Sequence, residues 1–271
     1  MNKSISLLLL VIVFTAYIFS GCETTNGDDE IAPELPPKST FIMDFSDFQN
    51  SSTKSLLLDN ESLTRFNHGF AALNVFFWNT FITIGMAIPV ASFIESFKHE
   101  AVLEGTKWWK WSYNFKAAGA LHKAELHAKL ADSVRWEMYI TKENYYTDFL
   151  WYYGEMNLEG TEGYWIMSKN PDSAISVLRI DWSREIKDSI ANIRYLNIEP
   201  DGPENGGYIS FELTEANPYD ARYTIFNKGK NNLVEIEWNR DTKEGRMKDS
   251  LLFKDMEWHC WNENLDDVVC E

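Results

Sequence analysis

The chain has 271 residues, a formal net charge of −16 at pH 7 and an aromatic content of 15%. An acidic surface is repelled by nucleic acid and by anionic membranes, so we exclude nucleic-acid binding. The aromatic content excludes general disorder and provides for a sizeable core, in one large domain or two small ones.

The first 21 residues have the features of a targeting segment. Lys3 precedes an uncharged apolar run over residues 5–19, which is short for a membrane span. The run ends in Ser20-Gly21-Cys22, and small residues before a cysteine resemble the lipobox of bacterial lipoproteins. That resemblance implies a signal peptide over 1–21, acyl chains on Cys22, and the membrane as a partner through them. The alternative is an uncleaved N-terminal anchor.

Residues 22–40 are expected to form a tether. The acidic stretch 23–30 resembles the surface-export signal of Bacteroidota lipoproteins, although a plain solvated tether would have a similar composition. The resemblance implies an outer-membrane lipoprotein of the cell envelope, either periplasmic or surface-exposed. Three prolines over residues 31–38 predict a semi-rigid linker, so the folded domain is expected over 41–271.

An uncharged stretch follows over residues 66–94. It predicts one long helix over 63–87 and a short helix that begins near Pro89 and ends near residue 100. Its asparagines and histidine are costly in hydrocarbon, which favours a buried core helix over a second membrane anchor.

Beyond residue 107 the hydrophobic period changes to two, as in strands with one buried face. Turn sequences separate these runs every 10–15 residues, too short an interval for crossover helices, so consecutive strands should pair antiparallel. Clear examples of alternation are residues 126–131, 134–141, 178–183, 209–213 and 234–238.

The fold class is therefore mainly β (α+β). We expect one large curved antiparallel meander of about ten strands, closed as a barrel or open as a half-barrel. The apolar helix should pack in or on its concave face, where both lose water. This architecture resembles the LolA-type half-barrel lipoprotein carriers, and more distantly the lipocalins, except that here a helix precedes the whole sheet.

Two cysteines remain besides Cys22. Cys260 and Cys270 form an even pair, and in an oxidising compartment we expect a disulfide between them. Free thiols or a metal site are the alternatives, but His259 is the only further ligand nearby.

A search for catalytic motifs finds none. The closest histidines, His122 and His127, would lie on opposite faces of a strand, and we expect each at the surface or at an edge. We therefore assign no catalytic residue, no metal site and no cofactor. A carboxylate pair for glycoside hydrolysis stays open because the chain has 41 acidic residues.

The aromatic clusters are the strongest candidates for a ligand-binding surface. Neighbouring residues on a strand face opposite ways, so some of these rings should be exposed, where they suit sugar rings, lipid tails or a protein partner. The alternative is that both faces of the sheet are covered where they lie. The candidate residues are Trp108, Trp109, Trp111, Trp151 and Tyr153.

Three functions are compatible with this sequence. The first is a lipid-anchored envelope protein that binds a hydrophobic or glycan ligand. The second is a non-catalytic accessory subunit of an outer-membrane assembly, which docks on an envelope protein. The third is a glycan-active enzyme. A cavity between helix and sheet would favour the first, a filled interior with an exposed aromatic patch the second, and converging carboxylates the third.

Overall fold

A computed structural model of the protein describes residues 31–49, 64–185 and 191–270. The chain divides into a short N-terminal unit, residues 1–31, and one compact unit, residues 32–271. The signal peptide, Cys22 and most of the predicted tether lie outside the described residues. The following description concerns the compact unit.

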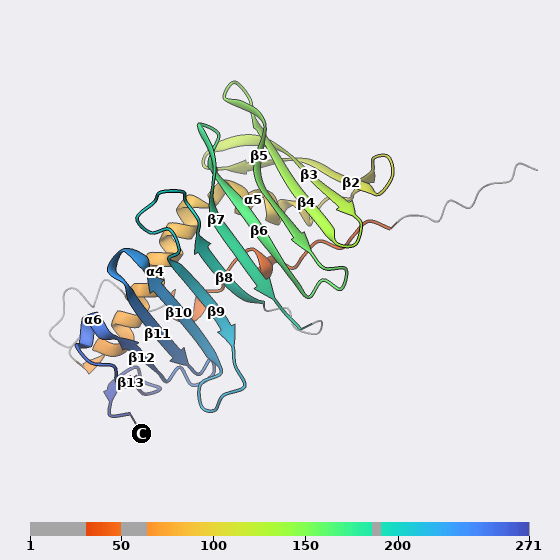
Figure 1. The fold of residues 1–271 in the computed structure, drawn as a ribbon. Coiled ribbons are helices and arrows are strands. Elements are labelled where there is room, and N and C mark those ends of the chain that lie inside the picture. The colour runs from red at the N-terminus through yellow and green to blue at the C-terminus, as the bar shows by residue number, and fades with distance from the viewer. Residues whose placement is uncertain (1–30, 50–63, 186–190, 271) are drawn as a thin grey trace, which may run out of the picture. The chain divides into compact units, whose positions relative to one another are not determined.

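A single antiparallel sheet dominates this unit (Figure 1). Its strands are β1 (Val102–Leu103), β2 (Trp108–Ala117), β3 (Ala120–Leu130), β4 (Val134–Lys142), β5 (Tyr146–Met156), β6 (Glu162–Asn170), β7 (Ser173–Ser183), β8 (Asn192–Asn197), β9 (Tyr208–Leu213), β10 (Ala221–Asn227), β11 (Asn232–Trp238), β12 (Gly245–Asp249), β13 (His259–Trp261) and β14 (Asp267–Val268). The helices are η1 (Lys38–Thr40), α2 (Ser46–Gln49), α4 (Phe66–Gly85), α5 (Ala87–Ser96), η3 (Lys228–Lys230) and α6 (Ser250–Phe253).

The strands pair strictly in sequence order, so the predicted curved antiparallel meander is confirmed. Within the described residues fourteen strands form, where about ten were expected, and the shortest of them have two or three residues. The prediction of a closed barrel is wrong: β1 and β14 each pair with a single neighbour and form the two edges of an open sheet. Closure would require these edges to meet, whereas helices and N-terminal residues occupy the space on one face.

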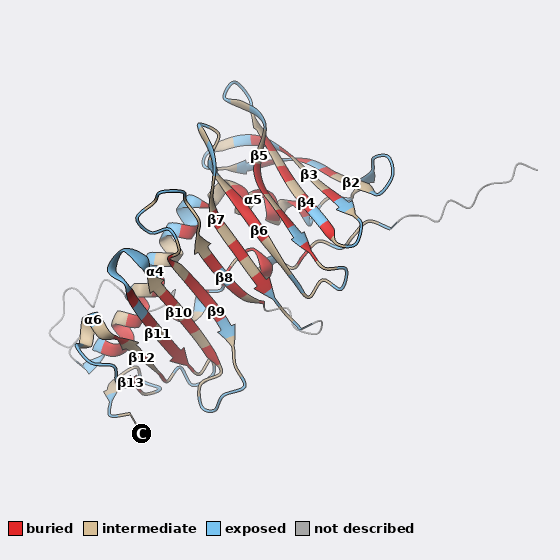
Figure 2. Ribbon diagram, in the orientation of Figure 1, coloured by how far each residue is buried: buried red, intermediate tan, exposed pale blue. Residues whose placement is uncertain are grey.

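We call the face that α4 and α5 cover the inner face, and the opposite one the outer face. In Figure 1 the outer face is turned toward the viewer and the helices lie behind the strands. Along most strands buried residues alternate with more exposed ones, as the banding in Figure 2 shows. The predicted period of two therefore corresponds to an apolar inner face and a more polar outer face.

Large and small residues alternate across the inner face. Gly154 pairs with Trp165, and Gly163 pairs with Trp182, each across one strand boundary. A Cβ atom added to Gly154 would lie 2.6 Å from the Trp165 ring, and one at Gly163 would lie 2.7 Å from the Trp182 ring. The indole rings thus lie over the glycines, which is possible only where the partner has no side chain.

Residues 38–49 fill the middle of the inner face. Phe41 is fully buried and contacts Phe93 and Trp165, with ring centroids 4.7 and 5.6 Å away. The hydroxyl of Tyr195 accepts a hydrogen bond from the Met43 amide at 2.8 Å and donates one to the Phe41 carbonyl at 2.9 Å. These contacts hold residues 41–45 against the sheet, where Phe41, Met43 and Phe45 are buried and Asp44 is exposed.

The two predicted helices correspond to α4 and α5, which are bent by 73° at a break between them. In this orientation α4 contacts β12, β13 and β14, and α5 contacts β2. Tyr113 of β2 donates a 2.7 Å hydrogen bond to the Ser92 carbonyl of α5. Within the described residues, neither helix alone has the length and apolar character of a membrane span, and only the bent pair does so by composition.

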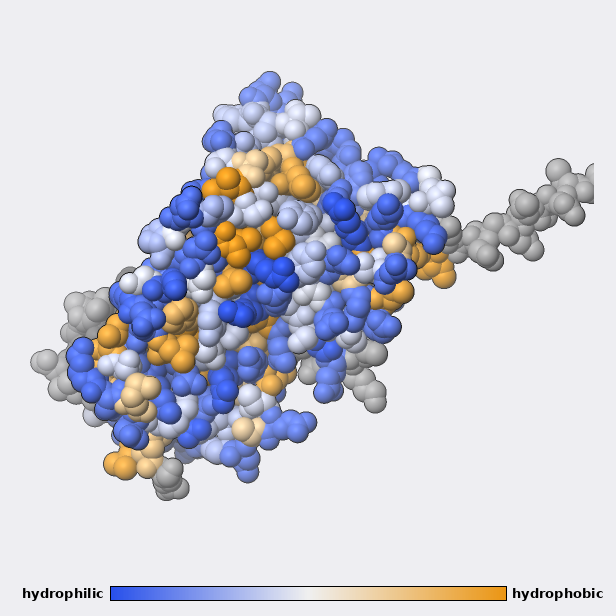
Figure 3. All heavy atoms as spheres, viewed as in Figure 1, coloured by the Kyte–Doolittle hydropathy of each residue, from blue (hydrophilic) through white to orange (hydrophobic). Residues whose placement is uncertain are grey.

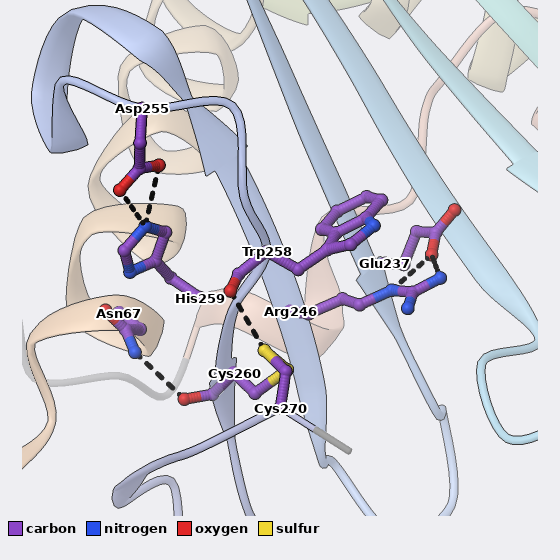
Figure 4. The surroundings of a disulfide bond; sticks show 8 residues. All are labelled: Asn67, Glu237, Arg246, Asp255, Trp258, His259, Cys260 and Cys270. Carbon is purple, nitrogen blue, oxygen red and sulfur yellow. Dashed lines mark hydrogen bonds and ion pairs between the residues drawn. A yellow bond between two sulfur atoms is a disulfide. The ribbon is translucent and has the colours of Figure 1, made fainter.

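The C-terminal hairpin fixes the start of α4. Cys260 and Cys270 form the predicted disulfide across a separation of ten residues. Within that loop, the Asp267 carboxylate accepts hydrogen bonds from the amides of Phe66 at 3.0 Å and Asn67 at 2.9 Å. The side chain of Asn67 also donates to the Cys260 carbonyl at 2.9 Å (Figure 4). A carboxylate at these free amides stabilises the helix and orients it on the sheet.

Candidate functional site

One face of α4 is apolar and points away from the sheet. Its exposed side chains recur at helical spacing, so they share a single side of the helix. Phe77 is 69% exposed and Ile84 is 75% exposed, although both are among the most hydrophobic residue types. We call this surface the α4 apolar face, and it consists of Phe66, Leu73, Phe76, Phe77, Phe81 and Ile84.

The opposite side of α4 is buried. Ala71, Ala72 and Val75 are at most 1% exposed and pack in the core. The helix packs on the sheet as expected, but the prediction of a buried core helix does not hold for the α4 apolar face. The sequence pattern does not predict this exposed side. In an amphipathic helix the polar residues mark the side that faces water, but this helix is apolar all round.

Aromatic rings on the outer face of the sheet differ from those on α4 because charged side chains cover them. Positive side chains lie over the rings there: Arg179 over Tyr164 at 4.4 Å, and Arg194 over Tyr208 at 4.1 Å from the centroid. Figure 3 shows this face, where hydrophobic patches are separated by hydrophilic residues. A guanidinium stacked on an aromatic ring covers the apolar face of the ring and presents a charged group to water. No Asp, Glu, Lys or Arg occurs between Phe66 and Ile94, so no charged side chain of α4 itself can cover its exposed rings.

The same arrangement continues at the C-terminal end of the outer face. Arg246 lies over Trp258 at 4.2 Å and donates to Glu237 at 2.7 Å, as Figure 4 shows. Arg222 also pairs with Glu237, which is 5% exposed. At this end of the outer face, Glu237 therefore has two cationic partners and a guanidinium covers the ring of Trp258.

The five aromatic residues predicted as a ligand surface lie in different environments in the structure. Trp109, Trp111 and Trp151 are buried at 7% exposure or less, so they belong to the core. Trp108 and Tyr153 are partly exposed. Trp108 lies near Lys129, and Tyr153 pairs with Ile166 in the middle of the sheet. The five residues do not form one common surface.

A hollow of about 360 Å³ lies beside Trp108, lined by Glu104, Trp108, Trp109, His127, Glu137 and Tyr139. Its two carboxylates already have partners. Glu104 pairs with Lys110, and Glu137 pairs with Arg135 at 2.7 Å and accepts from Tyr139 at 2.9 Å. Burial, together with the Glu137 hydrogen bond, raises the pKa of Tyr139. The hollow combines an indole ring with hydrogen-bonding groups, a combination that suits a sugar.

A second hollow, of about 350 Å³, lies where α2 meets α4, lined by Ser46, Asp47, Phe48, His68, Trp238, Lys243 and Leu265. Asp47 accepts hydrogen bonds from the Trp238 indole at 2.9 Å and the Lys243 ammonium at 2.7 Å. These polar groups link the N-terminal segment to the sheet. Sequence reasoning did not select them, because they are distant in the chain and match no motif.

One of the two histidines expected at the surface or an edge is buried. His122 is 2% exposed and stacks on Phe115, at 5.2 Å between ring centroids, so the prediction of a surface or edge position is wrong for it. His127 lies on the opposite face of β3, as the odd separation predicts. In the described part of the chain, no three His, Cys, Asp or Glu side chains are grouped as metal ligands.

His68 is held neutral in the core. It is 6% exposed, and its ring lies 5.6 Å from that of Phe48 and 5.4 Å from that of Trp261. Burial, with a smaller contribution from the positive charge of Arg65, lowers the pKa of His68 from 6.5 to about 4.

This shift predicts a pH-dependent contribution to stability. Above pH 6.5 the histidine is neutral in both states, whereas between pH 6.5 and 4 the unfolded chain takes up a proton that the folded chain does not. Between pH 7 and 4.5, His68 should therefore lower the free energy of unfolding by about 2 kcal/mol. Urea unfolding of the wild type and of His68→Phe, which keeps a ring but does not titrate, measures this difference. Equal losses in the two proteins would contradict it.

No family model, curated protein or solved structure matches this chain. The resemblance to LolA-type carriers therefore stays a prediction from architecture. What defines the molecule is its own geometry: an open antiparallel sheet with a packed inner face and a helix whose uncovered side is apolar.

Proposed function

We propose that this chain is a lipid-anchored protein of the cell envelope, attached through Cys22, that acts as a non-catalytic accessory protein and docks through the α4 apolar face. The observation that carries the docking role is the exposure of large apolar side chains along one side of α4, among them Phe76, Phe77, Phe81 and Ile84. Contiguous apolar surface of this kind marks interaction sites in soluble proteins.

The packing of the inner face also supports docking rather than ligand transport. Between helices and sheet lie some of the largest side chains of the protein, including Trp136, Trp165, Tyr152 and Phe93, each at most 1% exposed. The N-terminal segment adds Phe41 to this layer. A carrier needs room between helix and sheet. Around α5 these side chains occupy that space, and the hollow of about 350 Å³ where α2 meets α4 is lined in part by the Asp47–Lys243 ion pair.

Ligand binding is the second candidate function, and the hollow beside Trp108 is the observation that favours it. Its indole and its carboxylates would suit a glycan better than a lipid tail. A sugar mass retained by the full chain in native mass spectrometry, and lost in Trp108→Ala, would support this second function.

Docking through α4 predicts that the helix is shielded in the envelope. We would introduce one thiol at Phe77→Cys and label intact envelopes with a water-soluble maleimide. We expect the thiol to be protected, because Phe77 lies at the centre of the α4 apolar face. In the same protein Cys260 and Cys270 are paired, so the new thiol reports alone, provided that Cys22 is acylated.

Leu121→Cys is the matched control. Leu121 is 61% exposed, close to the 69% of Phe77, but its side chain lies on the outer face of β3. This thiol should be labelled freely in the same envelopes. Equal labelling at the two positions would show that nothing covers α4, and the docking role would be abandoned.

A further inference from the structure

We propose that the α4 apolar face docks on the lipid bilayer itself, with α4 lying in the plane of the membrane interface and its exposed rings among the acyl chains. This inference rests on the proposed function, because it names the occupant of the same docking surface. Three properties of the chain carry it: the length of the tether, the chemistry of the face, and the position of the nearest charges.

The tether is too short to hold the domain far from the membrane. Ala32, where the compact unit begins, is ten residues after Cys22. Even a fully extended chain spans only about 3.3–3.6 Å per residue, so an acylated Cys22 keeps Ala32 within roughly 35 Å of the lipid.

The tether also enters on the same side as the helices. Ala32 and Leu35 pack against the core, and the ammonium of Lys38 lies 5.4 Å from the ring of Phe97, just beyond α5. In Figure 1 this N-terminal segment runs behind the sheet, together with α4 and α5. An anchor that joins the domain on this side would allow the α4 apolar face to reach the membrane.

The composition of the face suits hydrocarbon rather than a polar partner. Its exposed members are phenylalanine, leucine and isoleucine, and the polar residues between them are Asn, Thr and the buried His68. Together α4 and α5 reach the hydropathy of a membrane segment, although they are bent by 73°. Such a bent pair cannot cross as one straight helix, but it can present one apolar side to an interface.

In the sequence, the nearest charged residues lie outside the α4 apolar face. Arg65, before α4, pairs with Asp266 at 2.9 Å, and Glu95, near the end of α5, pairs with Lys98 at 2.8 Å. Asp267 binds the first amides of α4, at the same end as Arg65. Between Arg65 and Glu95 the chain has no Asp, Glu, Lys or Arg. Because the protein is acidic, we expect binding to zwitterionic lipid and no gain from anionic lipid.

The test uses the full acylated chain carrying Phe77→Cys, labelled with an environment-sensitive fluorophore. The protein is reconstituted, at few copies per vesicle, into vesicles of phosphatidylcholine and phosphatidylethanolamine that contain no other protein. We expect a blue-shifted emission and several-fold stronger quenching by lipids spin-labelled on the acyl chain than for a probe at Leu121→Cys. Replacing part of the lipid with phosphatidylglycerol should not increase the shift. Unchanged thermal unfolding of both variants confirms that each is folded.

Each result that differs from this expectation leads to a different conclusion. A Phe77 probe that stays in water, like the Leu121 probe, overturns the bilayer proposal, while protection of the same thiol in native envelopes would still support docking on a protein. A shift that grows with the number of copies per vesicle also overturns it, because a second copy of the chain would then cover α4. A purified chain without acyl mass contradicts the proposed anchoring, whatever the probe reports.

Discussion

Gly154→Ala should destabilise the protein by about 2 to 3 kcal/mol, a large effect for the addition of one methyl group. The new Cβ would lie 2.6 Å from the Trp165 ring and closer still to the Tyr164 carbonyl oxygen. Neither neighbour can retreat easily, because Trp165 is 1% exposed and Tyr164 is held in the ladder between β5 and β6. Chemical denaturation monitored by tryptophan fluorescence measures the loss.

Gly85→Ala is the control for this experiment. Gly85 ends α4, and a Cβ atom there would meet nothing within 4 Å. The same chemical change should therefore be neutral or slightly stabilising. A similar free energy of unfolding for the two variants would show that the indole does not lie over Gly154 as described.

Removal of the disulfide should have an effect of similar size. Replacing Cys260 and Cys270 with alanine opens a loop of ten residues, and the chain-entropy estimate for such a loop is about 2 to 3 kcal/mol. The loss should also reach α4, because Asp267 lies inside the loop and binds the first amides of the helix. We expect faster hydrogen exchange in the first turn of α4, measured by mass spectrometry.

A double-mutant cycle separates the two effects. With the disulfide intact, Asp267→Ala removes a helix-capping carboxylate and should cost about 1 kcal/mol. Without the disulfide, the hairpin is no longer held in place and the same substitution should cost less. Strict additivity would contradict the idea that the disulfide acts on α4 through Asp267.

Much of the fold follows from local pattern. The alternation in segments such as 134–141 and 234–238 predicts strands correctly, and the short turns predict antiparallel pairing in sequence order. Closure does not follow, since it depends on whether β1 and β14 meet across the inner face. Whether they meet depends on the volume of the side chains packed on the inner face, which come from residues as distant in sequence as Phe41 and Trp261.

The candidate site was predictable only in part. The uncharged run 66–94 predicts the apolar helix, and its apolar character by itself indicates burial. Exposure of Phe77 depends on how much of α4 the sheet can cover, and a sheet face covers one side of a helix. The strand aromatics do not form one exposed surface for the opposite reason: the core accommodates Trp109, which lies opposite the small Ala128, and also Trp151. Neither property is local.

Coverage of the α4 apolar face in the envelope is best measured on the unmodified chain. Carbene footprinting of native envelopes, read by mass spectrometry, labels side chains in proportion to their access to water. In the isolated chain Phe77 and Ile84 are more exposed than Leu121 and Leu233 on the outer face. We predict the reverse order in envelopes, with α4 labelled weakly and the two outer-face leucines labelled strongly. Labelling that follows the exposures of the isolated chain would contradict this account.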